Sequence, residues 1–312
     1  MKISKPKFWD LKKPNYISYF LLPFTLPIII NNFFLSLKKN IKYKNIRTIC
    51  VGNIYLGGTA KTPLTIKLNQ ILKKSNFKTA TIKKFYKNQI DEQKLLESKS
   101  SLYCKKQRVE ALKNAIEDNI DIAIFDDGLQ DAYMNYDLSF VCFNNVNWIG
   151  NGFLIPSGPL REKLKDIYKY DAIFLNGNEE DNSEIKNSIK KISSKMKIFE
   201  TYYKPINIHK LNIEDNYLIF SGIGSPNSFK KTLLKYNFKI IKEIIFPDHY
   251  QYTKKDIEKI KLLAMDLKAT IITTEKDYVK ISQQSLNKIN FLEIDLVIKK
   301  EDELINFIKS KI

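Results

Sequence analysis

The residue types that hold a polyphosphate lie together in residues 51–63, Val-Gly-Asn-Ile-Tyr-Leu-Gly-Gly-Thr-Ala-Lys-Thr-Pro. The paired glycines Gly57 and Gly58 let successive backbone N–H groups turn toward an anion, and a helix that starts directly after them adds partial positive charge. Lys61 supplies a full positive charge, and the hydroxyl of Thr62 is a ligand for Mg²⁺. The segment therefore predicts a phosphate-binding loop in an enzyme that uses a nucleotide triphosphate.

Two positions of this loop depart from the strict pattern G-x-x-x-x-G-K-[ST]. The pattern has glycine at positions 55 and 60, where this chain has Tyr55 and Ala60. The methyl group of Ala60 costs free energy if the backbone takes a positive φ there, although the glycines before it could absorb the turn. The alternative interpretation is an ordinary glycine-rich turn from a strand into a helix.

A second nucleotide signal follows further along the chain. Residues 120–125 have the apolar character of a buried strand, and Asp126 and Asp127 come directly after it. Carboxylates at the C-terminal edge of a parallel strand can hold or orient Mg²⁺ beside the phosphates of a nucleotide. Taken alone, Asp-Asp-Gly could be a turn. Together with the loop upstream, it predicts a magnesium site.

The elements around these motifs alternate between strand and helix. Strands are expected at 47–51, 120–125, 171–175, 217–220 and 269–273, and helices at 64–72, from Pro226 onward and from a capping box at 253–256 through Leu267. The alternation predicts an α/β protein: a P-loop NTPase-like parallel sheet domain and a second, smaller α/β domain. We expect an N-terminal membrane-associated helical segment at 1–40, the nucleotide-binding domain at 41–165 and the second domain at 166–312.

Six motifs in order give the chain a family resemblance over nearly its whole length. They are the phosphate loop, 126–130 (Asp-Asp-Gly-Leu-Gln), 150–162, 220–226, 246–250 (Phe-Pro-Asp-His-Tyr) and 273–277 (Thr-Thr-Glu-Lys-Asp). The chain resembles the tetraacyldisaccharide 4'-kinase family of lipid A biosynthesis. The resemblance implies Mg²⁺-ATP-dependent phosphorylation of the 4'-hydroxyl of a tetraacyldisaccharide 1-phosphate lipid, forming lipid IVA.

The site residues follow from the motifs and from this resemblance. The cofactor-binding candidates are Gly57, Gly58, Thr59, Ala60, Lys61, Thr62, Gln130, Arg161 and Glu162, and the metal candidates are Thr62, Asp126 and Asp127. The catalytic candidates are Lys61, Asp91 as the base that draws the proton from the hydroxyl, and His249, which would tune or orient Asp91. The resemblance is incomplete at 83–93, where most of the family's loop pattern is missing, and at Asp131, which replaces a histidine. A structural role is the alternative for His249, and a hinge salt bridge is the alternative for Arg161 and Glu162.

Charge and hydropathy patterning suggest a membrane surface as partner. Residues 17–37 contain no charge and are flanked by lysines, but Pro23 and Pro27 interrupt them, so we expect a kinked helix that is embedded in or lies on a membrane. A buried core helix is the alternative. The net charge of +18 comes almost entirely from lysine, which favours a solvated lysine-rich surface over a nucleic-acid groove. A positive surface would still assist residence on an anionic membrane leaflet. Together with these patterns, the family resemblance implies a peripheral or monotopic protein at the cytoplasmic face of a bacterial inner membrane.

Three scattered cysteines indicate reduced core residues and not a disulfide framework. Two rival functions stay open. A P-loop kinase or ATPase with another acceptor would keep all the nucleotide motifs. A non-catalytic, membrane-associated nucleotide-binding module would agree with Ala60 and with the altered loop near residue 85, and it would bind ATP without turnover.

Overall fold

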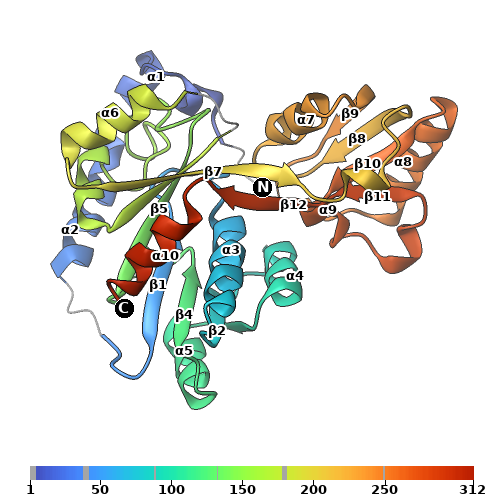
Figure 1. Ribbon diagram of the computed structural model, residues 1–312. Helices are drawn as coiled ribbons and strands as arrows, with labels where there is room; N and C mark the ends of the chain where they lie inside the picture. Colours follow the sequence, from blue (N-terminus) through green and yellow to red (C-terminus); the bar gives the residue numbers. More distant parts are fainter. Residues whose placement is uncertain (1–4, 38–41, 88, 132, 178–180, 249) are drawn as a thin grey trace. The chain divides into compact units, whose positions relative to one another are not determined.

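The computed structural model describes residues 5–37, 42–87, 89–131, 133–177, 181–248 and 250–312. The chain forms two compact units, each with its own sheet (Figure 1). The larger unit consists of Met1–Phe85, Lys99–Tyr202 and Leu296–Ile312, and the smaller one of Tyr86–Ser98 and Tyr203–Asp295. The prediction of an α/β protein with a smaller second unit is confirmed.

The larger unit is built on an eight-stranded sheet with the order β12-β7-β6-β5-β1-β4-β2-β3. The strands are β1 (Arg47–Gly52), β2 (Thr79–Lys84), β3 (Leu102–Lys105), β4 (Ile122–Asp126), β5 (Leu138–Asn144), β6 (Ala172–Asn176), β7 (Lys197–Pro205) and β12 (Ile294–Ile298). The described pairings from β3 to β7 are all parallel. Every residue of β4 is buried, as expected of a central parallel strand covered on both faces.

Helices cover this sheet and carry apolar residues at helical spacing. They are α3 (Lys61–Lys74), α5 (Arg108–Glu117), α6 (Ser183–Ile192) and α10 (Glu301–Lys309), with a 3-10 turn at Leu164–Lys169. In α3, Leu64, Leu68 and Leu72 recur every fourth residue and are all buried. This packing fixes α3 against the sheet directly after the phosphate loop.

The smaller unit has a parallel four-stranded sheet with the order β11-β10-β8-β9. Its strands are β8 (Asn216–Ser221), β9 (Lys239–Ile245), β10 (Thr270–Thr274) and β11 (Ile289–Leu292). Its helices are α4 (Ile90–Lys99), α7 (Pro226–Lys235), α8 (Lys254–Asp266) and α9 (Glu275–Tyr278), with 3-10 turns at Ile208–Lys210 and Gln283–Ser285. The expected capping box opens α8: the Thr253 hydroxyl accepts from the Asp256 N–H, and the Asp256 carboxylate accepts from the Thr253 N–H.

The units divide the chain differently from the boundary that we expected between residues 165 and 166. Strands β6 and β7 extend the large sheet, because the apolar side chains of β6 pack on its neighbours: the Phe174 ring lies 5.2 Å from that of Phe140 and 5.3 Å from that of Phe199, between centroids. Residues 296–312 return to the larger unit, and 86–98 leave it. The larger unit is therefore assembled from three separate stretches of chain.

The N-terminal segment is kinked, as the prolines indicated. It forms a 3-10 turn at Lys7–Asp10, α1 (Tyr16–Phe20), a second 3-10 turn at Leu22–Thr25 and α2 (Leu26–Leu37). Pro23 lies inside the second 3-10 turn and has no N–H to continue the ladder of α1, so a single helix over 17–37 does not form. No helix in the described part of the chain is both long and apolar enough to cross a bilayer.

Candidate nucleotide and magnesium site

The phosphate loop runs from the end of β1 at Gly52 to the start of α3 at Lys61, and a buried asparagine shapes it. The side chain of Asn53 is fully buried, and its Nδ2 donates to the Tyr55 carbonyl at 2.6 Å and to the Thr59 hydroxyl at 2.9 Å. The backbone carbonyl of Asn53 accepts a hydrogen bond of 3.0 Å from Gln130 Nε2. These bonds tie both arms of the loop to one side chain.

The two departures from the strict loop pattern have different explanations. Tyr55 is 1% exposed, and its hydroxyl contacts Lys5 and Asp10 of the N-terminal segment, so this side chain anchors the segment to the loop. Ala60 takes a left-handed conformation with φ 65° and ψ 23°. The glycines before it therefore do not absorb the turn, and the methyl group adds strain of about 1 kcal/mol.

Asp126 lies at the C-terminal end of β4, directly opposite the start of α3. The register that pairs Val51 with Asp126 brings its carboxylate to the loop, where the Thr62 hydroxyl donates to Oδ2 at 3.2 Å. Thr65 lies 3.5 Å from Oδ1, and the Lys83 ammonium lies 2.6 Å from Oδ2. The side chains of Thr62 and Asp126, far apart in sequence, therefore meet.

The donor set at this point fits Mg²⁺. The Thr62 hydroxyl and the carboxylates of Asp126 and Asp127 are the hard oxygen ligands that this ion prefers. Within the described residues, no cluster of three or more His, Cys, Asp or Glu side chains could hold a metal ion by itself. A Mg²⁺ ion that keeps water and takes phosphate oxygens needs no such cluster.

Asp127 follows in a left-handed conformation with φ 57° and faces several cations. Its Oδ1 lies 3.4 Å from Arg161 Nη1 and 3.9 Å from Lys61 Nζ, and its carbonyl accepts a hydrogen bond of 2.5 Å from Arg108. Burial alone would raise the pKa of the Asp127 carboxyl, but the charges of Lys61, Arg161, Lys83 and Arg108 hold it below its usual value. The carboxylate is therefore ionised in a locally cationic site, which suits a polyphosphate.

Gln130, Arg161 and Glu162 form one hydrogen-bonded group beside the loop. Gln130 accepts from Arg161 Nη1 at 2.9 Å and donates to Glu162 Oε1 at 3.1 Å. Tyr170 donates to the other oxygen of Glu162 at 2.9 Å, and Lys169 also pairs with it. Arg161 thus pairs with Asp127 and Gln130, and Glu162 pairs with Gln130, Tyr170 and Lys169.

Asp91 lies in the smaller unit, on α4, inside a buried ionic group. Its carboxylate is fully buried and lies 3.6 Å from the ammonium groups of both Lys276 and Lys280. Lys276 also lies 3.2 Å from Glu92 and 3.7 Å from Asp248. Burial lowers the pKa of Lys276, but the three carboxylates outweigh that effect and raise it. Lys276 therefore stays charged beside Asp91.

The structure brings most of the predicted site residues together within the larger unit. These are Lys61, Thr62, Asp126, Asp127, Gln130, Arg161 and Glu162, with the loop residues Gly57, Gly58, Thr59 and Ala60. Asp91 belongs to the smaller unit instead of the domain at 41–165, and His249 lies outside the described residues. Sequence reasoning missed Asn53, Lys83 and Arg108. The burial of Lys83 at the end of β2 became visible only in the structure.

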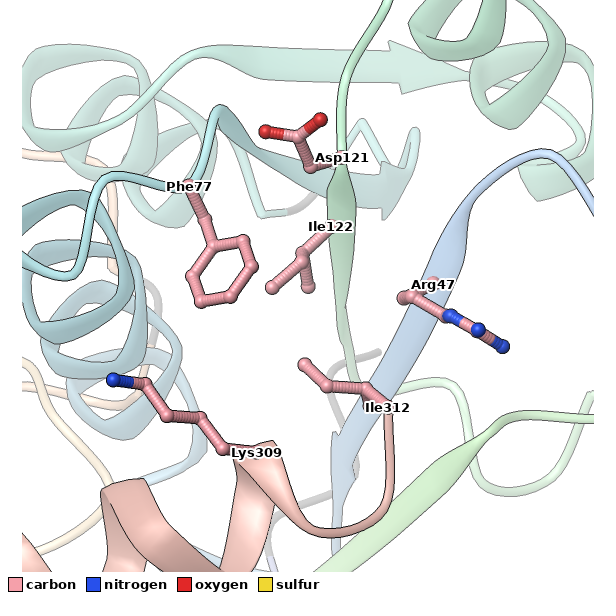
Figure 2. A pocket seen from close by; sticks show the side chains of 6 residues that line it. All are labelled: Arg47, Phe77, Asp121, Ile122, Lys309 and Ile312. Carbon is pink, nitrogen blue, oxygen red and sulfur yellow. The ribbon is translucent and has the colours of Figure 1, made fainter.

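A separate cavity of about 250 Å³ lies at the opposite end of the strands of this sheet, where β1 and β4 begin (Figure 2). It is lined by Arg47, Phe77, Asp121, Ile122, Lys309 and Ile312. Arg47 and Ile122 are the first residues of β1 and β4, whereas the nucleotide site lies where these strands end. The cavity is therefore not part of the candidate site.

The fold and the site define a P-loop nucleotide-binding protein. The defining features are a parallel sheet, a glycine-containing loop, a Lys-Thr pair that opens the following helix and an aspartate at the end of the neighbouring strand. The family described as tetraacyldisaccharide-1-P 4'-kinase matches residues 25–312. The chain is 48% identical over 308 residues to a tetraacyldisaccharide 4'-kinase of Pelagibacter ubique, covering 98% of this chain and 97% of the relative. It is 34% identical to that of Rickettsia typhi, covering 97% of each chain.

The crystal structure of LpxK from Aquifex aeolicus in complex with ATP has the same fold, with a TM-score of 0.71 at 23% identity, over 94% of this chain and 99% of that one. The chain belongs to the tetraacyldisaccharide 4'-kinase family. The predictions of a kinase, of ATP with Mg²⁺ as its cofactors and of a lipid disaccharide substrate are confirmed at the level of this family.

Proposed function

We propose that this chain transfers the γ-phosphoryl group of ATP to the 4'-hydroxyl of a tetraacyldisaccharide 1-phosphate, and that the site described above carries the reaction. The observation that carries the assignment is the contact of the Thr62 hydroxyl with the Asp126 carboxylate at 3.2 Å, with Lys61 beside Asp127. A loop that grips phosphates and a carboxylate that steadies a divalent ion must meet in this way for phosphoryl transfer.

Each residue has a role that its surroundings support. Lys61 and the loop N–H groups bind the β- and γ-phosphates, and Arg161 offers a further cation next to Asp127. Thr62 and Asp126, with Asp127, would hold Mg²⁺, which when bound offsets the negative charge of the phosphates. Asn53 keeps the loop in shape through its hydrogen bonds to Tyr55 and Thr59.

Asp91 is the proposed base for the acceptor hydroxyl. Its carboxylate is held in place by the ammonium groups of Lys276 and Lys280, each 3.6 Å away, and a carboxylate is a group that can accept the proton of a hydroxyl. His249, whose placement lies outside the described residues, keeps its proposed role of tuning Asp91. Asp91→Asn should abolish phosphoryl transfer while leaving ATP affinity within about twofold, because the base and the nucleotide-binding residues belong to different units.

The test of the whole assignment is chromatography of radiolabelled product formed from Mg²⁺-ATP and the unphosphorylated 4'-acceptor lipid. Lys61→Ala should lower turnover by at least a hundredfold, because a preorganised cation at the transferring phosphate is lost. The matched control is Lys73→Ala, an exposed lysine in the last turn of the same helix. Near-normal activity of Lys61→Ala would contradict the assignment. Label on a different acceptor, or ATP binding without any product, would favour one of the two rival functions.

The membrane surface is the proposed location of the reaction, at the cytoplasmic face of a bacterial inner membrane. The N-terminal helices expose large apolar side chains: Tyr16 is 80% exposed, Phe20 74% and Phe33 60%. Exposed Lys12 and Lys13 precede them. An apolar face next to basic residues favours insertion into an anionic interface.

Sedimentation with vesicles of anionic phospholipid tests this location. Phe20→Ser combined with Phe33→Ser should release most of the protein from the vesicles, because two of the largest exposed apolar side chains are removed. Replacing Tyr133, which is 61% exposed in a loop of the larger unit, with serine is the control. Equal sedimentation of all three proteins would contradict a role of the N-terminal face.

A further inference from the structure

Lys83 is a buried cation in contact with the aspartate of the proposed magnesium site. It is the penultimate residue of β2, 2% exposed, and its ammonium lies 2.6 Å from Asp126 Oδ2. The register of β2 on β4, which pairs Ile82 with Phe125, brings Lys83 alongside Asp126. Its place is therefore set by the sheet and not by a flexible surface chain.

Burying this lysine requires a strong partner. An ammonium group loses its hydration when it is taken out of water, and an ion pair with good geometry is what compensates for that loss. Asp126 is equally buried, at 1% exposure, and already receives the Thr62 hydroxyl at 3.2 Å. The charge of Asp126 is thus compensated within the protein before any metal ion arrives.

This arrangement has a consequence for a divalent ion at the same carboxylate. The attraction of Asp126 for Mg²⁺ is offset by the nearby positive charge of Lys83, and the two cations repel each other. The side chain of Lys83 is enclosed, so it cannot swing into solvent to make way. Phosphate oxygens, which bring several negative charges, restore a favourable field for the ion.

We propose that Lys83 is a positioning residue that sets the metal affinity of the site: it keeps Asp126 aimed at Thr62 in the empty protein and prevents Mg²⁺ from binding there without nucleotide. The inference rests on the proposed assignment of Thr62 and Asp126 to the magnesium site. In physical terms, Mg²⁺ enters together with ATP, because the phosphate charges are needed to offset the repulsion between Mg²⁺ and Lys83.

The test compares Mg²⁺ dependence in full-length variants. Lys83→Gln keeps an N–H donor for Asp126 but removes the charge, and Lys83→Arg keeps the charge. Lys78→Gln removes an equal charge from an exposed lysine just before the other end of β2 and is the matched control. Two quantities are measured: the Mg²⁺ concentration that half-saturates binding of a non-hydrolysable ATP analogue, and the shift of Tm caused by Mg²⁺ alone.

Lys83→Gln should lower the half-saturating Mg²⁺ concentration by about tenfold, because one unit charge next to the ion is gone. Mg²⁺ without nucleotide should also raise the Tm of Lys83→Gln, whereas it should not raise the Tm of the wild-type protein or of Lys78→Gln. Lys83→Arg should stay within about twofold of wild type. An unchanged or higher Mg²⁺ requirement in Lys83→Gln would overturn the proposal, and so would a tenfold shift in Lys83→Arg. If Lys83→Gln folds only when Mg²⁺ is present, the ion has replaced the missing charge, as proposed; if it does not fold at all, the Lys83→Arg result decides.

Asp126→Asn separates this inference from the assignment on which it rests. If Asp126→Asn leaves the Mg²⁺ requirement of nucleotide binding unchanged, the magnesium site itself is misassigned. If Asp126→Asn raises that requirement and Lys83→Gln does not lower it, the site is supported and only the role of Lys83 is overturned.

Discussion

Asn53 offers a stringent test of how the loop acquires its shape. In Asn53→Asp the shape of the side chain is kept, but an oxygen replaces the Nδ2 that donates to the Tyr55 carbonyl at 2.6 Å and to the Thr59 hydroxyl at 2.9 Å. The Thr59 hydroxyl can rotate and donate to the new oxygen. The carbonyl cannot, so two oxygens face each other in a fully buried place.

The cost can be estimated from these contacts. One unsatisfied buried carbonyl and one poorly solvated carboxylate together cost roughly 3 kcal/mol of the free energy of unfolding. A domain with the usual 5–15 kcal/mol of stability stays folded after such a loss, so its nucleotide affinity can still be measured. Because the loop can no longer be tied at both arms, affinity for Mg²⁺-ATP should fall at least about tenfold.

The chain contains a closely matched control at Asn69. This side chain is also buried at 1% exposure, and its Nδ2 donates to the Thr65 carbonyl at 3.0 Å and to the Thr81 hydroxyl at 2.8 Å. Asn69→Asp should therefore lose about the same 3 kcal/mol in urea unfolding, while ATP affinity by calorimetry changes less than about threefold. If both variants lose ATP affinity equally, or if Asn53→Asp loses no stability, Asn53 does not shape the loop as argued.

Three other changes have outcomes that the structure determines. Ala60→Gly relieves the strain of the left-handed backbone but raises the conformational entropy of the unfolded chain. The free energy of unfolding, measured in urea, should therefore change by no more than about 1 kcal/mol, and a larger loss would contradict the φ of 65°. Gly150→Ala would place a Cβ 2.1 Å from the Trp9 carbonyl at φ +58°, so limited proteolysis should cleave the N-terminal segment faster than in wild type; unchanged cleavage would refute this packing. Burial raises the pKa of the Asp137 carboxyl, but Lys42 and the N–H and hydroxyl of Thr48 lower it below 3.8 on balance. Its stabilising effect is therefore fully present above about pH 5 and is lost as the pH falls through the lowered pKa. The difference in free energy of unfolding between wild type and Asp137→Asn should thus become smaller on acidification, and a difference that grows would contradict this explanation.

Local patterns predicted the elements that carry the nucleotide site. The β-branched run before Gly52, the spacing of Leu64, Leu68 and Leu72, and the apolar stretch ending at Asp126 each encode their structure within a few residues. The meeting of Thr62 with Asp126 followed from one rule, that the carboxyl ends of neighbouring parallel strands lie at the same edge.

What could not be predicted depends on pairings between distant strands. Lys83 has the appearance of a surface lysine in sequence, and only the register of β2 on β4 reveals its partner. The assignment of Asp91 to the smaller unit likewise depends on where α4 packs, because Leu95 and Leu96 are the only apolar residues that this helix buries. The strain at Ala60 could not be predicted, because it depends on the φ angle of this residue and the glycines before it could have made the turn instead.

The three-part construction of the larger unit affects how the protein is made on the ribosome. Strand β7 has β12 as its neighbour, and Leu304 and Ile308 of α10 are fully buried, with Phe307 in contact with Phe199 at 6.0 Å between ring centroids. Most of β12 and all of α10 come after residues 203–295, which make up most of the smaller unit. During translation the edge of β7 stays uncovered until that entire stretch has been synthesised, and an open strand edge is a site of aggregation. Slow synthesis of the smaller unit should therefore lower the yield of native protein through the larger one.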